Sequence, residues 1–338
     1  MSPNARLALK LGYEAIEDAG IAPTTLNGKS WGVFTAVNDS GWGKKRMKIL
    51  DLNDYAEGLS GNADDAIGAR LSYFLNLTGP TMEIKSACSS SAVAIHQACN
   101  AIRLGDCQAA VVISSVTQFD PAALVFRASK GIVSKRGVSS PYSNHTDGYV
   151  AAEGAAAIIL QRADQCKVNS YGRIKATTVT QDGRSRGFFA PNPQSQKRLL
   201  ETALLKSGFI PEDISLVEGH GTGTPLGDAI ELQALKDVYG SRRTKPLYLG
   251  SIKAAIGHTE ECAGLAGLLK TLCCLQYDAI PPQPTITGIN DDIDFSAAKL
   301  VVPQGLVPFL PGLTPRVVAI SSFGLSGTLA QLIIEDPP

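Results

Sequence analysis

Cys88 is placed where a cysteine can act as a nucleophile. It stands in the run SACSSS at 86–91, where an extended stretch is followed by an Ala-rich helical pattern. A cysteine at the start of a helix faces unpaired backbone N–H groups and the positive end of the helix dipole, and both favour the thiolate. Because a thiolate accepts acyl groups, this position indicates an acyl-accepting thiol, the alternative being a buried structural cysteine.

The other cysteines are interpreted as structural. The chain has seven in all, an odd number, without a C-x-x-C pair, which argues against a disulfide framework and a structural zinc site. The six assigned no chemistry are Cys99, Cys107, Cys166, Cys262, Cys273 and Cys274.

Two of the four histidines lie in glycine-rich turns between a predicted strand and a predicted helix. His220 is within EGHGTGTPLGD at 218–228, and His258 ends GSIKAAIGH at 250–258. An imidazole can hold or donate a proton near neutral pH, so both are candidates to serve the thiol chemistry. We expect the glycines around His220 to clear space for a substrate. The alternative for His220 is a hydrogen-bonded core histidine.

Lys253 lies in the same turn as His258, in a run of small and apolar residues. A buried lysine there would need a partner and would supply a local positive charge that orients its neighbours. The alternative is a lysine exposed to solvent in a turn, which is the commoner environment of this residue.

Glycine-rich loops elsewhere do not match the common templates. The dinucleotide pattern G-x-G-x-x-G fails because residue 224 is Thr, and the hydrolase pattern G-x-S-x-G fails because residue 328 is Thr. SSFGLSGT at 321–328 is instead predicted to be a loop after a strand, able to present backbone N–H groups and to move.

The elements that position these residues alternate between helical patterns and short apolar runs, which is typical of an α/β protein. A strand over 81–85 and a helix over 89–103 frame Cys88. Strands over 214–217, 247–250 and 317–321 precede the other three segments. A polar connector at 163–173 separates two similar series of elements, and we therefore expect halves at 1–165 and 166–338.

Composition excludes several classes of protein. The 338 residues contain 31 Lys+Arg and 31 Asp+Glu, so no net positive field favours nucleic acid or a membrane surface as a partner. The chain shows no apolar run long enough to span a bilayer and no signal peptide. We expect a cytoplasmic enzyme.

The four segments together, and in this order, resemble the β-ketoacyl synthase (ketosynthase) domains of type I polyketide synthases, over Pro3 to about Glu335. The matching strings are SACSSS at 86–91, EGHGTGTPLGD at 218–228, GSIKAAIGHTEECAG at 250–264 and SSFGLSGT at 321–328. The resemblance implies a thiolase-type α/β fold, with two similar halves in αβαβα layers, and a homodimer. It also implies that the family's first strand region is absent from this chain.

The same resemblance implies roles for individual residues. Cys88 matches the acyl-accepting nucleophile, His220 and His258 match the two active-site histidines, and Lys253 matches the lysine beside them. The backbone N–H groups of Cys88 and Leu325 match the oxyanion hole.

The implied reaction is a decarboxylative Claisen condensation. An acyl chain on the phosphopantetheine of a carrier-protein domain passes to Cys88, and a malonyl-type unit then loses CO₂ and attacks it. An acyl or peptidyl carrier protein is the implied partner. We expect no bound metal, nucleotide or redox cofactor.

The 321–328 loop departs from the family's usual G-F-G-G-T-N. Leu325 stands where the family has a gating Phe, Ser326 replaces a Gly, and Leu329 replaces the Asn. We expect Phe323, Leu325 and Ser326 to shape a wider substrate entrance, and Ser326 to restrict the backbone.

Two alternatives remain, of which the first follows from the departures in the loop. One is Dieckmann-type ring closure that releases a tetramic acid, as in the terminal ketosynthase of the fungal hybrid tenuazonic acid synthetase, a nonribosomal peptide–polyketide enzyme. The other is a non-catalytic partner or scaffold. A thiolase that uses a second catalytic cysteine is disfavoured, because the loop contains none.

Overall fold

The computed structural model describes residues 1–43, 63, 66–166, 170–240, 243–286, 288 and 298–337. The chain divides into two compact units, and neither is a continuous stretch of sequence. The first unit contains Met1–Phe126, Glu153–Asn169 and Glu260–Leu265; the second contains Arg127–Ala152, Ser170–Thr259 and Ala266–Pro338. The predicted halves at 1–165 and 166–338 divide the chain by sequence position and stay a prediction.

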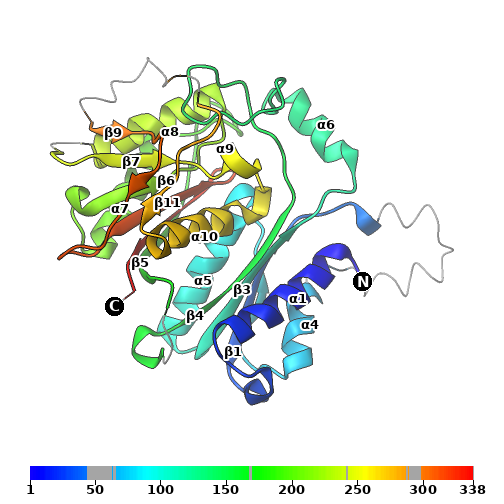
Figure 1. Ribbon diagram of the computed structural model, residues 1–338. Helices are drawn as coiled ribbons and strands as arrows, with labels where there is room; N and C mark the ends of the chain where they lie inside the picture. The colour runs from blue at the N-terminus through cyan, green and yellow to red at the C-terminus, as the bar shows by residue number, and fades with distance from the viewer. Residues whose placement is uncertain are drawn as a thin grey trace. The chain divides into compact units, whose positions relative to one another are not determined.

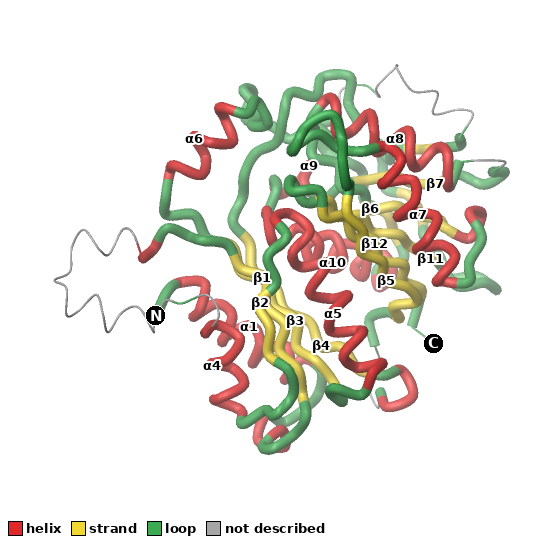
Figure 2. Tube along the Cα trace, turned by 180° about the vertical axis from the view of Figure 1, so that it is seen from behind, coloured by secondary structure: helices red, strands yellow, loops and turns green. Residues whose placement is uncertain are grey.

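The first unit is built on a four-stranded sheet in the order β2-β1-β3-β4, parallel except for the antiparallel β3–β4 pair. Helices α1 and α4 lie on one face of this sheet and α5 on the other (Figures 1 and 2). The elements are α1 (Pro3–Asp18), β1 (Trp31–Val37), α4 (Ala66–Leu75), β2 (Thr81–Glu83), α5 (Ser90–Leu104), β3 (Ala109–Val116) and β4 (Gly154–Gln161).

Buried apolar side chains hold these layers together. Every residue of β1 and β3 is buried, as expected for strands covered on both faces. Ile16 of α1 and Leu71 of α4 belong to the same core cluster as Val33 and Val111 of the sheet. Gly12 of α1 permits this approach, because a Cβ there would lie 2.6 Å from Leu71.

The second unit is built on a six-stranded mixed sheet in the order β5-β12-β11-β6-β7-β9. Pairs on both sides of β12 are antiparallel, and β11, β6, β7 and β9 run parallel. Helices α7 and α8 cover one face and α10 the other (Figures 1 and 2). The elements are β5 (Arg173–Gln181), α7 (Pro193–Ser207), β6 (Ile214–Glu218), α8 (Pro225–Val238), β7 (Leu247–Gly250), α9 (Lys253–Ile256), α10 (Ala263–Gln276), β9 (Leu300–Val301), β11 (Val317–Phe323) and β12 (Thr328–Glu335).

Short elements complete the described part of the chain. Strands β8 (Ala279–Ile280) and β10 (Val307–Pro308) pair with each other, and α6 spans Pro121–Ser129. The 3-10 helices are η1 (Pro23–Leu26), η2 (Ala87–Ser89), η3 (Ala163–Gln165), η4 (Pro211–Asp213) and η5 (Glu260–Cys262). Among the described residues, no helix combines the length and apolar character needed to cross a membrane.

The strands predicted before the His220, Lys253 and 321–328 segments, and the strand and helix predicted around Cys88, are confirmed. Strands β6 and β7 directly precede the His220 and Lys253 turns, and η2 and α5 follow β2 as expected. The 321–328 segment is more regular than expected. Strand β11 runs to Phe323 and β12 starts at Thr328, so only residues 324–327 form the turn of a β-hairpin.

Candidate active site

Cys88 lies in η2, between β2 and α5, in a turn held by its neighbouring serines. Ala87 adopts a φ of +53°, a left-handed conformation that costs about 1–2 kcal/mol for an L-residue. The Ser86 N–H donates to Ser90 Oγ at 2.9 Å, and that hydroxyl donates to the Ala87 carbonyl at 2.7 Å. Ser89 Oγ donates to the Ser86 carbonyl at 2.8 Å. These bonds fix the strained turn that presents Cys88 at the start of α5.

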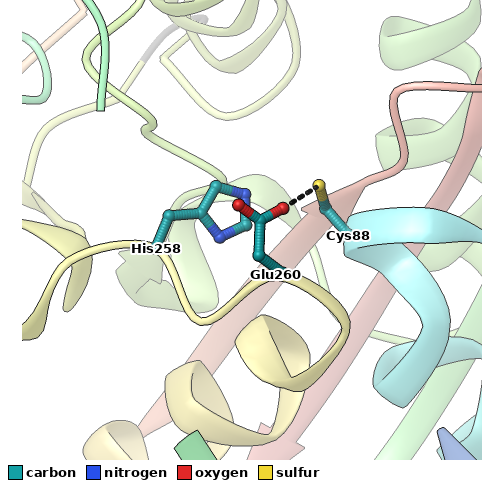
Figure 3. Close-up of side chains that lie close together, drawn as sticks. All are labelled: Cys88, His258 and Glu260. Carbon is teal, nitrogen blue, oxygen red and sulfur yellow. Dashed lines mark hydrogen bonds between the residues drawn. The ribbon is translucent and has the colours of Figure 1, made fainter. Parts of the chain in front are cut away.

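Glu260 lies beside the sulfur within the same unit. The Cys88 thiol donates to Glu260 Oε2 at a Sγ–O distance of 3.8 Å (Figure 3). Glu260 is only 5% exposed, so this carboxylate meets the thiol away from bulk water. The Leu265 N–H donates to Ser91 Oγ at 3.1 Å, which ties the segment carrying Glu260 to the first turn of α5. Sequence reasoning missed Glu260, although it lies within the quoted string at 250–264.

Most of the other cysteines are buried, whereas Cys88 is half-buried. Burial raises the pKa of Cys99 to about 11 and that of Cys262 to about 12, so both stay protonated near neutral pH. Cys107 and Cys274 are buried too, and burial raises the pKa of each. Cys88 is half-buried and therefore open to a reagent.

The turn that carries His220 is fixed by a buried carboxylate of α8. Glu231 accepts the backbone N–H of His220 at 2.6 Å and that of Gly221 at 2.8 Å. Asp228, one turn earlier on α8, accepts the N–H groups of Gly223 at 3.1 Å and of Tyr142 at 2.7 Å. Sequence reasoning assigned no role to either acid.

Tyr142 occupies the space that the glycines leave, which corrects the expectation that they make room for substrate. A Cβ on Gly219 would lie 1.8 Å from the Tyr142 hydroxyl oxygen, and one on Gly221 would lie 2.6 Å from it. The Tyr142 hydroxyl donates to Glu231 Oε2 at 3.1 Å. Because Gly219 and Gly221 have no side chains, there is room for the buried tyrosine to pack against the His220 turn.

The hydrogen bond to His220 Nδ1 assigns the tautomer of this ring. The backbone N–H of Phe323 donates to Nδ1 at 3.2 Å, so the proton of the neutral imidazole lies on Nε2. Burial, and then the positive charge of Lys253, lower the pKa of His220 well below its usual value. His220 therefore offers a neutral N–H donor from Nε2 at pH 7.

His258 is fully buried and held through its backbone. Its N–H donates to the Val150 carbonyl at 2.7 Å, and its own carbonyl accepts the Ala152 N–H at 2.9 Å. The His258 ring contacts the Tyr149 ring and stands edge-on to the His220 ring, with centroids 5.7 Å apart. Burial, and then Lys253 and His220, lower the pKa of His258 well below its usual value.

Lys253 is buried, at 3% exposure, so the interpretation as a solvent-exposed turn lysine is wrong. It begins α9, directly after the turn that follows β7. That turn is fixed by Glu218 at the end of β6, which accepts the Ile252 N–H at 2.6 Å and pairs with Lys270 at 2.7 Å. Lys253 is thus a fixed cation that disfavours protonation of both imidazoles.

The hairpin of β11 and β12 carries the predicted gating residues. Phe323 is buried, Leu325 is half-buried and Ser326 is exposed at the turn. Ser326 does not adopt a positive φ, whereas Gly327 does, with φ +87°. Within the described part of the chain, no acceptor takes the Leu325 backbone N–H.

The second unit therefore brings together most of the predicted site residues. His220 contacts both His258 and Phe323, and Lys253 acts on both imidazoles. Cys88 belongs to the first unit, where its described partner is Glu260.

Solved structures define the class of protein to which this fold belongs. A variant of the ketosynthase from module 6 of the bacillaene synthase of Bacillus subtilis 168 superposes with a TM-score of 0.93 at 35% identity, covering 100% of this chain and 58% of that one. The expected thiolase-type α/β fold is therefore confirmed.

Sequence comparisons agree. The profile "Beta-ketoacyl synthase, N-terminal domain" matches residues 1–166, and "Beta-ketoacyl synthase, C-terminal domain" matches residues 171–287. The chain belongs to the β-ketoacyl synthase family.

Its relatives include polyketide synthases. Erythronolide synthase EryA2 of Saccharopolyspora erythraea is 37% identical over 100% of this chain and 10% of that synthase. A phenolphthiocerol/phthiocerol polyketide synthase polypeptide of Mycobacterium bovis is 40% identical over 99% of this chain and 18% of that polypeptide. The chain thus spans less than a fifth of the length of these two relatives.

Proposed function

We propose that the chain is the ketosynthase domain of a polyketide synthase and catalyses decarboxylative Claisen condensation. The observation that carries this proposal is the pair of imidazoles held neutral beside a buried lysine, with the His220 proton on Nε2. Two fixed neutral donors suit a thioester oxygen that gains negative charge during decarboxylation.

The first step is acyl transfer to Cys88. The thiolate attacks the carbonyl of an acyl thioester on a carrier protein, and the phosphopantetheine thiol leaves as the new thioester forms. The backbone N–H groups of Cys88 and Leu325 hold the oxyanion. Among the described residues nothing accepts the Leu325 N–H at the hairpin turn, which supports its part in this role.

The second step forms the carbon–carbon bond. A malonyl-type thioester loses CO₂, and the electron pair of the broken C–C bond becomes an enolate. N–H groups of His220 and His258 donate to the enolate oxygen. The enolate carbon then attacks the acyl carbonyl, and the Cys88 thiolate leaves. The lengthened chain remains on the carrier protein, and the reaction needs no further cofactor.

Partners follow from this chemistry. A carrier-protein domain must deliver both substrates, and we propose that the chain acts as a homodimer in the cytoplasm. Membership of the family supports the carrier protein as a partner.

Ring closure is the second candidate. Leu325 and Ser326 at the hairpin turn differ from the residues usual in the family, and this difference favours an altered substrate. The acidic carbon of a β-ketoacyl-aminoacyl thioester would attack its own thioester carbonyl, releasing a thiol and a tetramic acid. The polyketide synthases among its relatives favour condensation, so we place the hybrid-enzyme cyclase second.

The deciding experiment offers malonyl and β-ketoacyl-aminoacyl thioester mimics in parallel. We expect an acyl-enzyme at Cys88 by intact-protein mass spectrometry, followed by CO₂ release and chain growth. A cyclic product without CO₂ would establish ring closure instead. Failure of acyl thioesters to modify Cys88 at all would favour a non-catalytic scaffold.

Two variants and a control assign the steps. Cys88→Ala abolishes the acyl-enzyme, whereas Cys273→Ala, at an exposed cysteine, preserves it. His258→Ala leaves acyl loading within about threefold but slows condensation by about 10²–10³, the usual cost of one oxyanion donor. Equal losses in both steps would contradict the role of His258.

A further inference from the structure

Gln181, the last residue of β5, contacts both sides of the hairpin turn. Its side-chain Nε2 donates to the Ser326 carbonyl at 2.8 Å, and its Oε1 accepts the Thr328 hydroxyl at 3.0 Å. Gln181 pairs with Thr328 in the β5–β12 ladder, so its side chain projects beside the turn from an adjacent strand. One exposed amide thus holds the residues on either side of Gly327.

Asp182 adds a third bond to the same turn. Its backbone N–H donates to the Gly327 carbonyl at 2.8 Å. The Asp182 carbonyl accepts Asn192 Nδ2 at 2.8 Å and Ser195 Oγ at 3.1 Å, which ties residue 182 to the start of α7. The hairpin turn is therefore anchored to a helix and not only to its own strands.

The side chains of Gln181 and Asp182 pack against Gly327. A Cβ on Gly327 would lie 2.9 Å from Gln181 Nε2 and 3.1 Å from the Asp182 Cβ. Because Gly327 also has a φ of +87°, neither its backbone nor its environment allows a side chain.

The opposite end of the turn faces the site. Phe323, which ends β11, donates its N–H to His220, and the Leu325 N–H has no acceptor in the described part of the chain. The carbonyls of Ser326 and Gly327 and the hydroxyl of Thr328 are thus held by hydrogen bonds. The Leu325 N–H remains available to a ligand. A donor in an oxyanion hole is effective only when its direction is fixed before the charge develops.

We propose that Gln181 and Asp182 form a clamp that fixes the direction of the Leu325 N–H, and that Gln181 is a positioning residue for acyl transfer. The inference deepens the proposed function and rests on it. The Gln181 side chain is exposed, and exposed side-chain bonds add little stability. The β5–β12 ladder already joins the two strands through backbone hydrogen bonds, so a purely structural role for Gln181 is disfavoured.

The test compares two reactions of the same sulfur. Acylation of Cys88 by a short acyl N-acetylcysteamine thioester needs an oxyanion hole, whereas alkylation by iodoacetamide does not. Gln181→Leu removes the two side-chain bonds of Gln181 and should slow acylation about tenfold, the effect of one to two ordinary hydrogen bonds. Alkylation should stay within about twofold and the melting temperature within about 3 °C, because the two bonds that are lost are exposed.

Further variants sharpen the result. Thr328→Val removes only the hydroxyl bond and should slow acylation about two- to threefold. Gln233→Leu is the matched control, since it removes an exposed side-chain bond of the same kind on α8, to Asp237 at 2.7 Å. Hydrogen exchange at residues 324–328 should accelerate in Gln181→Leu and not in the control.

Each outcome is decisive. Unchanged acylation in Gln181→Leu overturns the clamp, as does an equal loss of acylation and alkylation, which would report general damage. If wild-type Cys88 is alkylated but never acylated, the proposed function fails, and the hydrogen-exchange comparison still tests whether the clamp orders the turn.

Discussion

Lys253 sets the protonation state of the site through its charge. It is buried at the start of α9 and lowers the pKa of both His220 and His258, in addition to the effect of burial. It also acts on the buried Glu231, where it opposes the increase in pKa that burial causes. Burial and this cation together keep two imidazoles neutral, and the cation also favours the carboxylate that holds the His220 turn.

Replacing Lys253 by Met tests this role through pH dependence. Neutral imidazoles are needed, so activity is lost as pH falls through the imidazole pKa values, which lie well below 6.5 in the wild type. Without the cation these values rise toward 6.5, because one of the causes that lower them is lost while burial and, for His258, the charges of His220 and Arg127 remain. The acidic limb of kcat/KM, measured from pH 5 to 8, should move to higher pH.

A control variant distinguishes the effect of the Lys253 charge from a general disruption of the fold. Lys206→Met, at an exposed lysine near the end of α7, should leave the profile unchanged. A Lys253→Met profile that is lowered equally at every pH would mean that the lysine acts on stability or packing and not on the histidines.

At the scale of elements, Cys88, His220 and Lys253 each lie in a segment that follows a strand, and polar side chains hold each of these segments. Serines of α5 hold the Cys88 turn, Glu231 of α8 holds the His220 turn, and Glu218 of β6 holds the Lys253 turn. Buried N–H groups need partners, so each irregular turn requires an acceptor within reach. The turns are therefore rigid without regular secondary structure.

Gly219→Ala tests the packing beneath the His220 turn. The new methyl would lie 1.8 Å from the Tyr142 hydroxyl oxygen and 3.1 Å from Glu231 Oε1, both in buried groups. Because both groups are buried and hydrogen-bonded to each other, we expect a loss of about 1–3 kcal/mol in the free energy of unfolding. Denaturant titration measures the change.

Gly305→Ala serves as the comparison, because a Cβ at Gly305 meets nothing within 4 Å. It should change stability by less than about 0.5 kcal/mol. Equal stability of the two variants would show that Tyr142 does not fill the space at Gly219.

For the whole molecule, buried acids make stability depend on pH. Burial raises the pKa of Asp228 to about 7 from its usual 3.8. A group with a raised folded-state pKa stabilises the fold fully below its unfolded pKa, and that contribution is lost as pH rises through the folded value. Wild-type stability should therefore lose this contribution progressively between about pH 4 and pH 7.

Asp228→Asn isolates this effect, since the amide does not titrate. The difference in unfolding free energy between wild type and variant should fall with rising pH, with a slope of at most about 1.4 kcal/mol per pH unit. Chemical unfolding at pH 5, 6, 7 and 8 measures it. Parallel stability curves for the two proteins would refute the raised pKa. The titration of His220 and His258 is common to both proteins and cancels in the difference.

Local sequence predicted the main elements correctly. The strands before the His220 and Lys253 turns and the helix after Cys88 are visible as apolar runs and helical periodicity, which report burial within a few residues. The hairpin turn was expected to be longer, because alternation across β11 and β12 is hidden by their buried, largely apolar character.

The amino-acid sequence alone predicts which residues carry the chemistry, because Cys88, His220 and His258 each lie in a run of small residues next to predicted strands and helices. Only the tertiary structure decided their surroundings: Glu260 meets Cys88 from 172 residues away, Lys253 is buried and not solvated, and Tyr142 fills the space beside Gly219. Burial and long-range contacts depend on how distant elements pack, and no local pattern encodes that packing.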